Sequence, residues 1–214
     1  MKKLIILGLI MISFISVNAK KTNPYHTPGT KEYKQVTAKL LGLWTISSFT
    51  QKDKNKMEEC ESATFEFVDK GIKTGECVFR FKLNKDMVDK RLHAWNKKGV
   101  TLNVDEYYII CTADFRIHKK GDLVYIENPK YTVEITGSGE QLENFQGVEA
   151  AYIETQSAMK ESGGLTNLVG AKLLKEVSGT TFVPRIPEQV NYKNLKDNSV
   201  EFVTLFKHSL KMVK

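Results

Sequence analysis

Long apolar runs are missing from most of this 214-residue chain, and only its first part contains one. Lys2 and Lys3 precede a largely apolar stretch over residues 4–17, and the small residue Ala19 follows it. A basic start, a short apolar run and a small residue at its end are typical of a secretory signal peptide. The run is shorter than the ~20 residues that a bilayer-spanning helix needs. We therefore expect cleavage near Ala19, a periplasmic or secreted product, and no membrane span after cleavage.

Cysteine is also scarce, with three residues in the chain, Cys60, Cys77 and Cys111. Export places such thiols in an oxidising compartment, where an odd number leaves at least one unpaired. If a hairpin turns at residues 69–71, Cys60 and Cys77 lie out of register for a direct bridge. A disulfide from Cys111 to either Cys60 or Cys77 is one expectation. Three small buried hydrophobic side chains are the other.

Motifs of catalysis and cofactor binding are absent from the sequence. The chain has no Walker sequence, no dinucleotide-binding glycine pattern, no HExxH, no GxSxG and no CxxC. The acidic residues around Cys60 lack the alternating oxygen ligands of a calcium loop. Its histidines are not spaced as a metal-binding pair on one element; they are His26, His93, His118 and His208. We therefore expect no catalytic residue, no metal site and no cofactor, and interpret the protein as a non-enzyme.

Charge of one sign is not concentrated anywhere along the chain. The formal net charge is +7, and the lysines are spread in pairs such as Lys97-Lys98 and Lys119-Lys120. Proteins that bind nucleic acids usually carry a denser basic face. We expect a solvated basic surface and no nucleic-acid partner.

What the chain does contain is a series of segments in which apolar and polar residues alternate. Phe65 and Phe67 alternate with polar neighbours, and a turn is predicted at Asp69-Lys70-Gly71. Alternation with a period of two indicates strands that turn one face toward a core. Further strands or hairpins are predicted over residues 77–83, 107–127, 131–136 and 199–208.

Helical spacing is clearest over residues 146–161, where a helix is predicted. Residues 84–104 are consistent with a short helix or a long loop, and residues 165–177 with a helix or a strand. The apolar residues that carry the helical spacing of the first segment are Val148, Ala151, Tyr152, Thr155 and Met159.

The predicted elements divide the chain into three parts. A signal peptide covers residues 1–19, an extended or helical leader covers 20–38, and one domain covers 39–214. Long insertions are expected in this domain near 84–104 and 137–178. About eight strands, mostly joined by short turns, with a helical insertion before the last ones, predict a mainly β fold with an antiparallel barrel or sandwich.

The start of the domain resembles a known family. The sequence GLW at residues 42–44 and the hairpin around residues 65–71 resemble the lipocalin-like domain of many proteins that Bacteroidetes export. The resemblance covers about residues 40–136, with a final strand at 199–208. It implies an antiparallel β-barrel of about eight strands, in which Trp44 packs across the closed end. Trp44 and Gly42 would then have structural roles.

Aromatic residues are predicted to gather on the apolar faces of the strands. A barrel of eight strands either fills itself with side chains or holds one small ligand. The first function that we consider is an exported lipocalin-like binding protein with a small apolar or amphipathic ligand inside the barrel. The second is a cell-envelope interaction or accessory protein with a filled barrel. The candidates for the barrel interior and for ligand contact are Phe65, Phe67, Phe79, Phe81, Phe115, Tyr125 and Tyr131.

Overall fold

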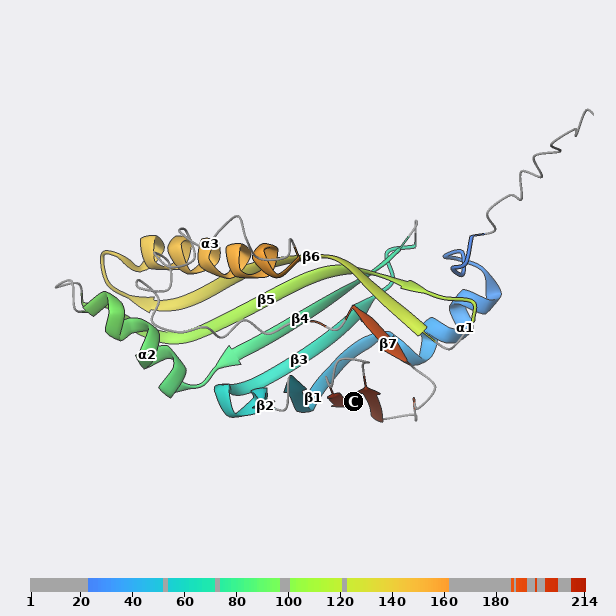
Figure 1. Cartoon of the computed structure of the whole chain (residues 1–214), viewed down its shortest axis with the longest axis horizontal. Coiled ribbons are helices and arrows are strands. Elements are labelled where there is room, and N and C mark those ends of the chain that lie inside the picture. The colour runs from blue at the N-terminus through green and yellow to red at the C-terminus, as the bar shows by residue number, and fades with distance from the viewer. Residues whose placement is uncertain are drawn as a thin grey trace, which may run out of the picture.

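A single antiparallel β-sheet forms the framework of the protein in the computed structural model (Figure 1). The expected signal peptide and residues 165–177 lie outside the part of the chain that the structure describes. The described residues are 23–51, 54–71, 74–96, 101–120, 123–161, 186, 188–191, 195, 199–203 and 209–214.

The strands of the sheet follow the chain with few crossovers. The order across the sheet is β7-β6-β5-β4-β3-β1-β9-β8, and β2 pairs with β1. Every pairing is antiparallel. Within the described residues no ladder joins β7 to β8, so the sheet is not closed into a barrel. The strands are β1 (Gly42–Gln51), β2 (Lys54–Asn55), β3 (Cys60–Val68), β4 (Gly75–Leu83), β5 (Asn103–Ile117), β6 (Leu123–Ser138), β7 (Gln189–Asn191), β8 (Ser199–Val203) and β9 (Ser209–Val213).

Three α-helices accompany the sheet in the described part of the chain, α1 (Lys31–Leu40), α2 (Lys85–Asn96) and α3 (Leu142–Glu161). A single turn of 3₁₀ helix, η1 (Lys56–Glu59), precedes β3. Figure 1 shows α3 lying along β6, with α1 and α2 at opposite ends of the molecule. The mainly β antiparallel fold with a helix before the last strands is therefore confirmed.

Helix α2 settles the choice that the sequence left open for residues 84–104. The side chain of Asn84 accepts a hydrogen bond from the backbone N–H of Met87 at 3.0 Å, which caps the start of the helix. Apolar residues then recur on one side of α2 and are buried. They are Met87, Val88, Leu92 and Trp95.

Helix α3 begins four residues earlier than predicted, at Leu142. Its buried side is also different, because Ala151 is exposed and Val148 is half-buried. Tyr152 is buried as predicted, together with Phe145 and Ile153, which the prediction did not include. A long helix with small apolar residues on several sides leaves the choice of buried face to the packing.

A β-bulge interrupts β6 and changes which of its residues face the core. The register of β5 against β6 shifts by one residue between Thr112 and Asp114. The extra residue on β6 falls at Asn128-Pro129, where Asn128 has a positive φ of 55°. Since side chains alternate along a strand, one extra residue moves all later residues to the opposite face. In β6, the even-numbered residues face the core before the bulge, and the odd-numbered residues face it after the bulge.

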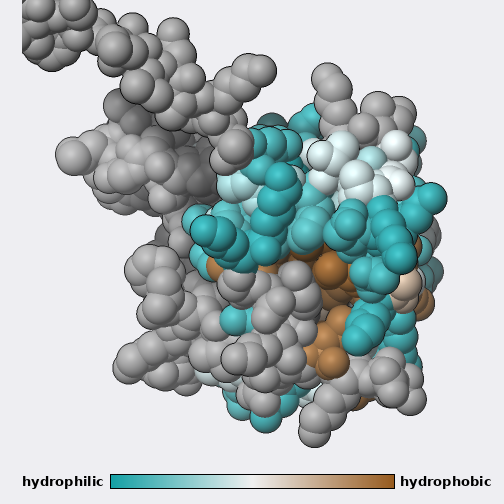
Figure 2. Space-filling view, turned by 90° about the vertical axis from the view of Figure 1, so that its right-hand side faces the viewer, coloured by the Kyte–Doolittle hydropathy of each residue, from teal (hydrophilic) through white to brown (hydrophobic). Residues whose placement is uncertain are grey.

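One face of the sheet, which we call the core face, carries a row of phenylalanines. Phe65 on β3 lies opposite Phe79 on β4, and Phe81 lies opposite Ile109 on β5. These side chains and the buried residues of α2 and α3 belong to one continuous hydrophobic core. The other face, the outer face, carries mainly polar side chains, such as Arg80 and Asp114. From the end that carries α1, the coloured surface is largely hydrophilic with a smaller apolar area (Figure 2).

Gly42 and Trp44 join α1 to the first strand. Gly42 has a φ of 105°, a conformation that L side chains rarely adopt. The Trp44 side chain is fully buried, and its indole N–H donates to the carbonyl of Leu40 at 2.7 Å. Leu40 is the last residue of α1, whose terminal carbonyls lack partners within the helix. These contacts tie the start of β1 to the end of α1.

Candidate functional site

The five phenylalanines that the sequence nominates for ligand contact all lie on the core face and pack on one another. Ring centroids are 4.4 Å apart for Phe65 and Phe67, 4.6 Å for Phe65 and Phe79, and 4.7 Å for Phe79 and Phe81. Phe115 contacts Phe67 edge to face, and none of the five is more than 1% exposed. A ligand therefore contacts these rings only if it displaces part of this packing.

The two nominated tyrosines of β6 lie on opposite faces of the sheet. Tyr131 lies opposite Cys111 on the core face and is half-buried. Tyr125 lies opposite Arg116, the neighbour of Phe115, and so belongs to the outer face. The expectation that Tyr125 joins the other aromatics in the interior is corrected here, because the bulge in β6 separates the two tyrosines.

Tyr125 belongs instead to an outer cluster that holds the leader to the sheet. Its ring centroid lies 5.8 Å from those of Tyr25 and His118, and the guanidinium carbon of Arg116 lies 4.3 Å from the centre of the Tyr25 ring. Arg116 also forms an ion pair with Glu127. The three rings contact one another. Tyr25 also forms a β-bridge with His118. We therefore interpret the outer cluster as the contact that holds the leader against the sheet.

The three cysteines are buried free thiols in the structure. Cys111 lies opposite Phe79 on β4, so Cys77 is its diagonal neighbour, at about 7–8 Å between Cα atoms. Cys60 lies on β3 opposite Leu83. Leu83 is about 13 Å along β4 from Phe79, the residue opposite Cys111. Both separations exceed the ~6.8 Å that a disulfide spans. Neither expected link is formed, and the register favours the reading as small buried hydrophobic residues.

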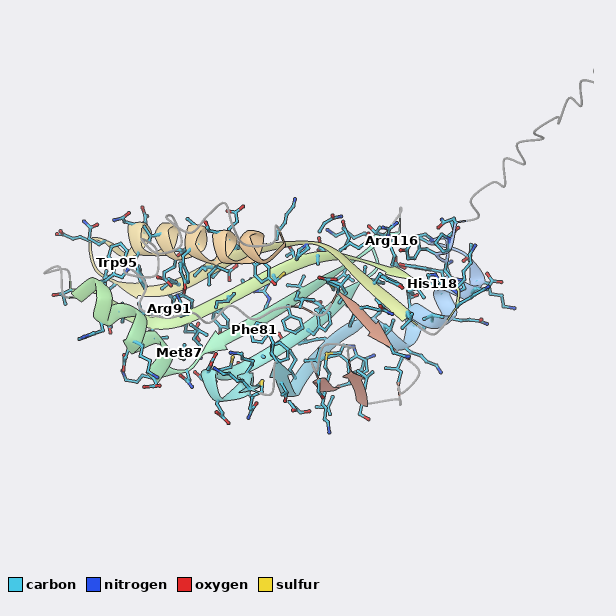
Figure 3. The ribbon with its side chains drawn as sticks, viewed as in Figure 1. Phe81, Met87, Arg91, Trp95, Arg116 and His118 are labelled. Atoms are coloured by element: carbon cyan, nitrogen blue, oxygen red, sulfur yellow. The ribbon has the colours of Figure 1, made fainter. Side chains whose placement is uncertain are left out.

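The most unusual site in the described residues is a buried group of polar side chains, the Arg91 cluster (Arg91, Tyr107 and Glu149). Nη1 of Arg91 donates to Oε2 of Glu149 at 2.5 Å, and the Tyr107 hydroxyl donates to the same oxygen at 2.6 Å. All three side chains are 0% exposed. Figure 3 shows Arg91 and its helix at one end of the sheet, and Arg116 and His118 at the other.

Three elements supply one member each to the Arg91 cluster. Arg91 lies four residues from both Met87 and Trp95 on the buried side of α2. Residues four apart share one helix face, so the packing that buries the apolar neighbours also buries the guanidinium. Tyr107 is on the core face of β5, two residues before Ile109.

Glu149 reaches the cluster in the same way from α3. It lies four residues from both Phe145 and Ile153, which are buried. The carboxylate therefore stands in the middle of an apolar helix face. Its second oxygen, Oε1, is buried and makes no hydrogen bond within the described part of the chain.

The electrostatics of the cluster favour a charged guanidinium and a protonated tyrosine. Burial raises the pKa of the Tyr107 hydroxyl well above its ordinary value, and the nearby Glu149 acts in the same direction. The pKa of Arg91 is also raised, because Tyr107 and Glu149 outweigh the lowering effect of burial. The guanidinium carbon lies 5.5 Å from the ring centre of Tyr107 and 5.7 Å from that of Tyr152. Two hydrogen-bond donors thus meet at one carboxylate oxygen of Glu149, near the rings of Tyr107 and Tyr152.

No member of the cluster is predicted from the sequence patterns above, although a signal for two of them is present. Arg91 and Glu149 are single charges placed at helical spacing among apolar residues. Such a charge must find a partner when its helix packs, since an isolated buried charge is very unfavourable. The partner itself could not be read from the sequence, because Arg91 and Glu149 are 58 residues apart on different helices.

Comparisons with family models, curated proteins and solved structures give no match. The lipocalin-like resemblance therefore draws no support from them. Among the described residues, no group of three or more histidine, cysteine or acidic side chains is arranged to hold a metal ion. No helix in this part of the chain combines the length and apolar character that crossing a membrane requires.

Proposed function

We propose that this protein is an exported binding protein of the lipocalin-like type, and that it holds a small amphipathic molecule between the curved sheet and α3. The observation that carries the proposal is the Arg91 cluster, in which two hydrogen-bond donors meet inside an apolar interface. Binding sites for small molecules are mostly apolar, with a few placed polar groups that fix the ligand's orientation. The surroundings of Arg91 have this composition.

Stability alone does not account for the cluster. A buried ion pair is often no better for folding than well-packed apolar side chains of the same size, because both charges lose their hydration. The remaining buried residues of α3, such as Phe145 and Ile153, are apolar and already hold the helix to the sheet. A role in binding explains why a charge is retained there.

The proposed site lies under α3 and not among the phenylalanines of β3 and β4. The phenylalanine rings fill their own space, whereas α3 is a separate element that covers the core face at β5 and β6. The ligand would occupy the space that Phe145, Tyr152 and Ile153 now take, after α3 moves outward. In this proposal the structure shows the closed position of α3.

The barrel and the lipocalin-like assignment belong to the same proposal. Their support is the opening of β1 at Gly42 and Trp44, the antiparallel strand order, and the approach of residues in β7 to residues in β8. Export rests on the apolar N-terminal segment of the sequence.

A second candidate function is a cell-envelope interaction protein that binds no small molecule. The mutual packing of Phe65, Phe67, Phe79 and Phe81 favours it, because a filled interior needs no ligand. Helix α3 would then be a surface for a partner protein.

Native mass spectrometry of the protein from its own cells separates the two candidates. The first predicts a retained small molecule that is lost from the Arg91→Met variant. It is kept by Arg116→Met, a matched control that removes an arginine paired with a glutamate on the outer face. A co-purifying protein partner without any small molecule would instead favour the second candidate.

A further inference from the structure

We infer that the ligand's headgroup is a carboxylate, and that Glu149 occupies its place in the closed form. The inference rests on the proposed function and adds the chemical class of the ligand. In the structure the guanidinium of Arg91 and the hydroxyl of Tyr107 already bind a carboxylate, which α3 supplies. An amphipathic monocarboxylate presents the same group with an apolar tail.

The charge balance of the cluster selects a single negative charge. Arg91 and Glu149 are the only charged side chains among the described residues that are completely buried. When α3 moves away with Glu149, the guanidinium needs a replacement of charge −1. A neutral headgroup does not replace the charge of Glu149, and a phosphate monoester brings close to two negative charges. A carboxylate restores neutrality.

Glu149 fills the site incompletely, which lets a free carboxylate compete with it. Only Oε2 of Glu149 accepts hydrogen bonds in the described residues, and Oε1 is buried without a partner. The helix backbone fixes the direction from which this side chain enters. An untethered carboxylate is free to rotate and present both oxygens to the guanidinium, the paired geometry that arginine favours.

Ligand binding is therefore coupled to the position of α3. Phe145, Tyr152 and Ile153 leave the core face when Glu149 leaves the guanidinium, because one helix carries all four. Only molecules in which α3 is open bind the ligand, so the apparent affinity falls as the closed fraction rises. Removing the carboxylate of Glu149 removes the internal competitor and raises this affinity.

Isothermal titration calorimetry with dodecanoate and methyl dodecanoate tests the inference on the full chain. The two probes have the same tail and differ in the charge of the headgroup. We expect dodecanoate to bind the wild-type protein at least tenfold more tightly than the ester. Glu149→Ala should raise the affinity for dodecanoate about tenfold. Arg91→Met should abolish the preference for the acid, and the control Arg116→Met should keep it.

The outcomes separate the inference from the proposed function. Equal affinity of the wild-type protein for both probes would overturn the carboxylate assignment and leave binding of an amphipathic molecule in place. A preference for dodecanoate that persists in Arg91→Met would overturn the assignment of the site. Failure of both probes to bind either the wild-type protein or Glu149→Ala would overturn the inference and the proposed function together. The comparison of the two probes on the wild-type protein does not depend on the folding of any variant.

Discussion

At the scale of single residues, the contact between Arg91 and Glu149 has the largest consequences for the molecule. The two side chains are fully buried and neutralise each other at 2.5 Å. Loss of either side chain removes the compensation that it gives to the buried charge of the other, which typically costs about 3–5 kcal/mol. Loss of both leaves an apolar contact between α2 and α3.

The single variants Arg91→Met and Glu149→Met should therefore each lower the free energy of unfolding by about 3–5 kcal/mol, whereas the double variant should recover most of the loss. Urea unfolding followed by circular dichroism measures all three. Arg116→Met is the matched control, with an expected loss of at most about 1 kcal/mol, because its ion pair is partly exposed. If the loss of unfolding free energy in the double variant equalled the sum of the two single losses, Arg91 and Glu149 would not compensate each other's charge.

The three buried thiols make the protein sensitive to alkaline pH. Burial raises the pKa of Cys60 and of Cys111 to about 12 and that of Cys77 further still. In the unfolded chain a thiol ionises near its ordinary value of about 8.5. A group whose pKa is raised by folding stabilises the protein fully below the unfolded value, and this contribution is lost as the pH rises.

We predict a stability that is steady up to about pH 8 and falls progressively toward pH 11 as the unfolded thiols ionise. The urea midpoint at a series of pH values measures this, and the variant Cys77→Ala should show a smaller alkaline loss. Titration with a thiol reagent in denaturant should give three free thiols without reductant. A stability that does not change up to pH 11, or one free thiol in place of three, would contradict the account.

At the scale of elements, two glycines of different backbone conformation provide an internal comparison. Gly42 opens β1 with a φ of 105°, and an added Cβ would meet nothing within 4 Å. Gly147 is exposed in the middle of α3, and an added Cβ there also meets nothing. Any difference between the two alanine variants therefore reports the backbone and not a clash.

Gly42→Ala should lower the free energy of unfolding by about 1–2 kcal/mol, since alanine at positive φ is strained. Gly147→Ala should raise it by about 0.5–1 kcal/mol, because alanine is the better helix former. Thermal unfolding of both variants measures the two effects. Equal shifts in the same direction would show that Gly42 does not need its observed conformation.

The strands and α3 were predictable because their patterns are local. Alternation in residues 77–83 and helical spacing in 146–161 each depend on neighbours within a few residues. The position of Tyr125 was not predictable in the same way, because it depends on the bulge at Asn128-Pro129. Proline inside a strand pattern is a recognised signal of an edge or a bulge, so Pro129 was the available warning.

The candidate site was harder to predict than the fold. The phenylalanines were identified correctly as residues of the apolar strand faces, but their alternation says nothing about whether a ligand separates them. Contacts such as that between Tyr107 and Glu149 join distant segments through packing. No local pattern in the sequence specifies that partner.

At the scale of the whole molecule, the proposed function requires a fixed sheet and a movable α3. The strands β3 and β4 are joined by backbone hydrogen bonds to neighbours on both sides. Helix α3 is held by its packing on β6 and by the Arg91 cluster. Elements held mainly by one packed face open more readily than central strands.

Hydrogen exchange should report this difference in the full chain. We expect the backbone amides of α3 to exchange faster than those of β3 and β4, and their exchange to accelerate further when dodecanoate is added. Mass spectrometry of peptides from residues 142–155 and 60–68 measures the two regions side by side. Slower exchange of α3 in the presence of dodecanoate would contradict an outward movement of the helix.

The central claim is that Arg91 binds the carboxylate of an amphipathic ligand in place of Glu149. Carbon-13 NMR of carboxyl-labelled dodecanoate with the full chain tests it most directly. The account predicts a resonance of bound ligand, distinct from that of free dodecanoate, which is absent with Arg91→Met and present with Arg116→Met. Absence of any bound resonance, or an identical one with Arg91→Met, would contradict it.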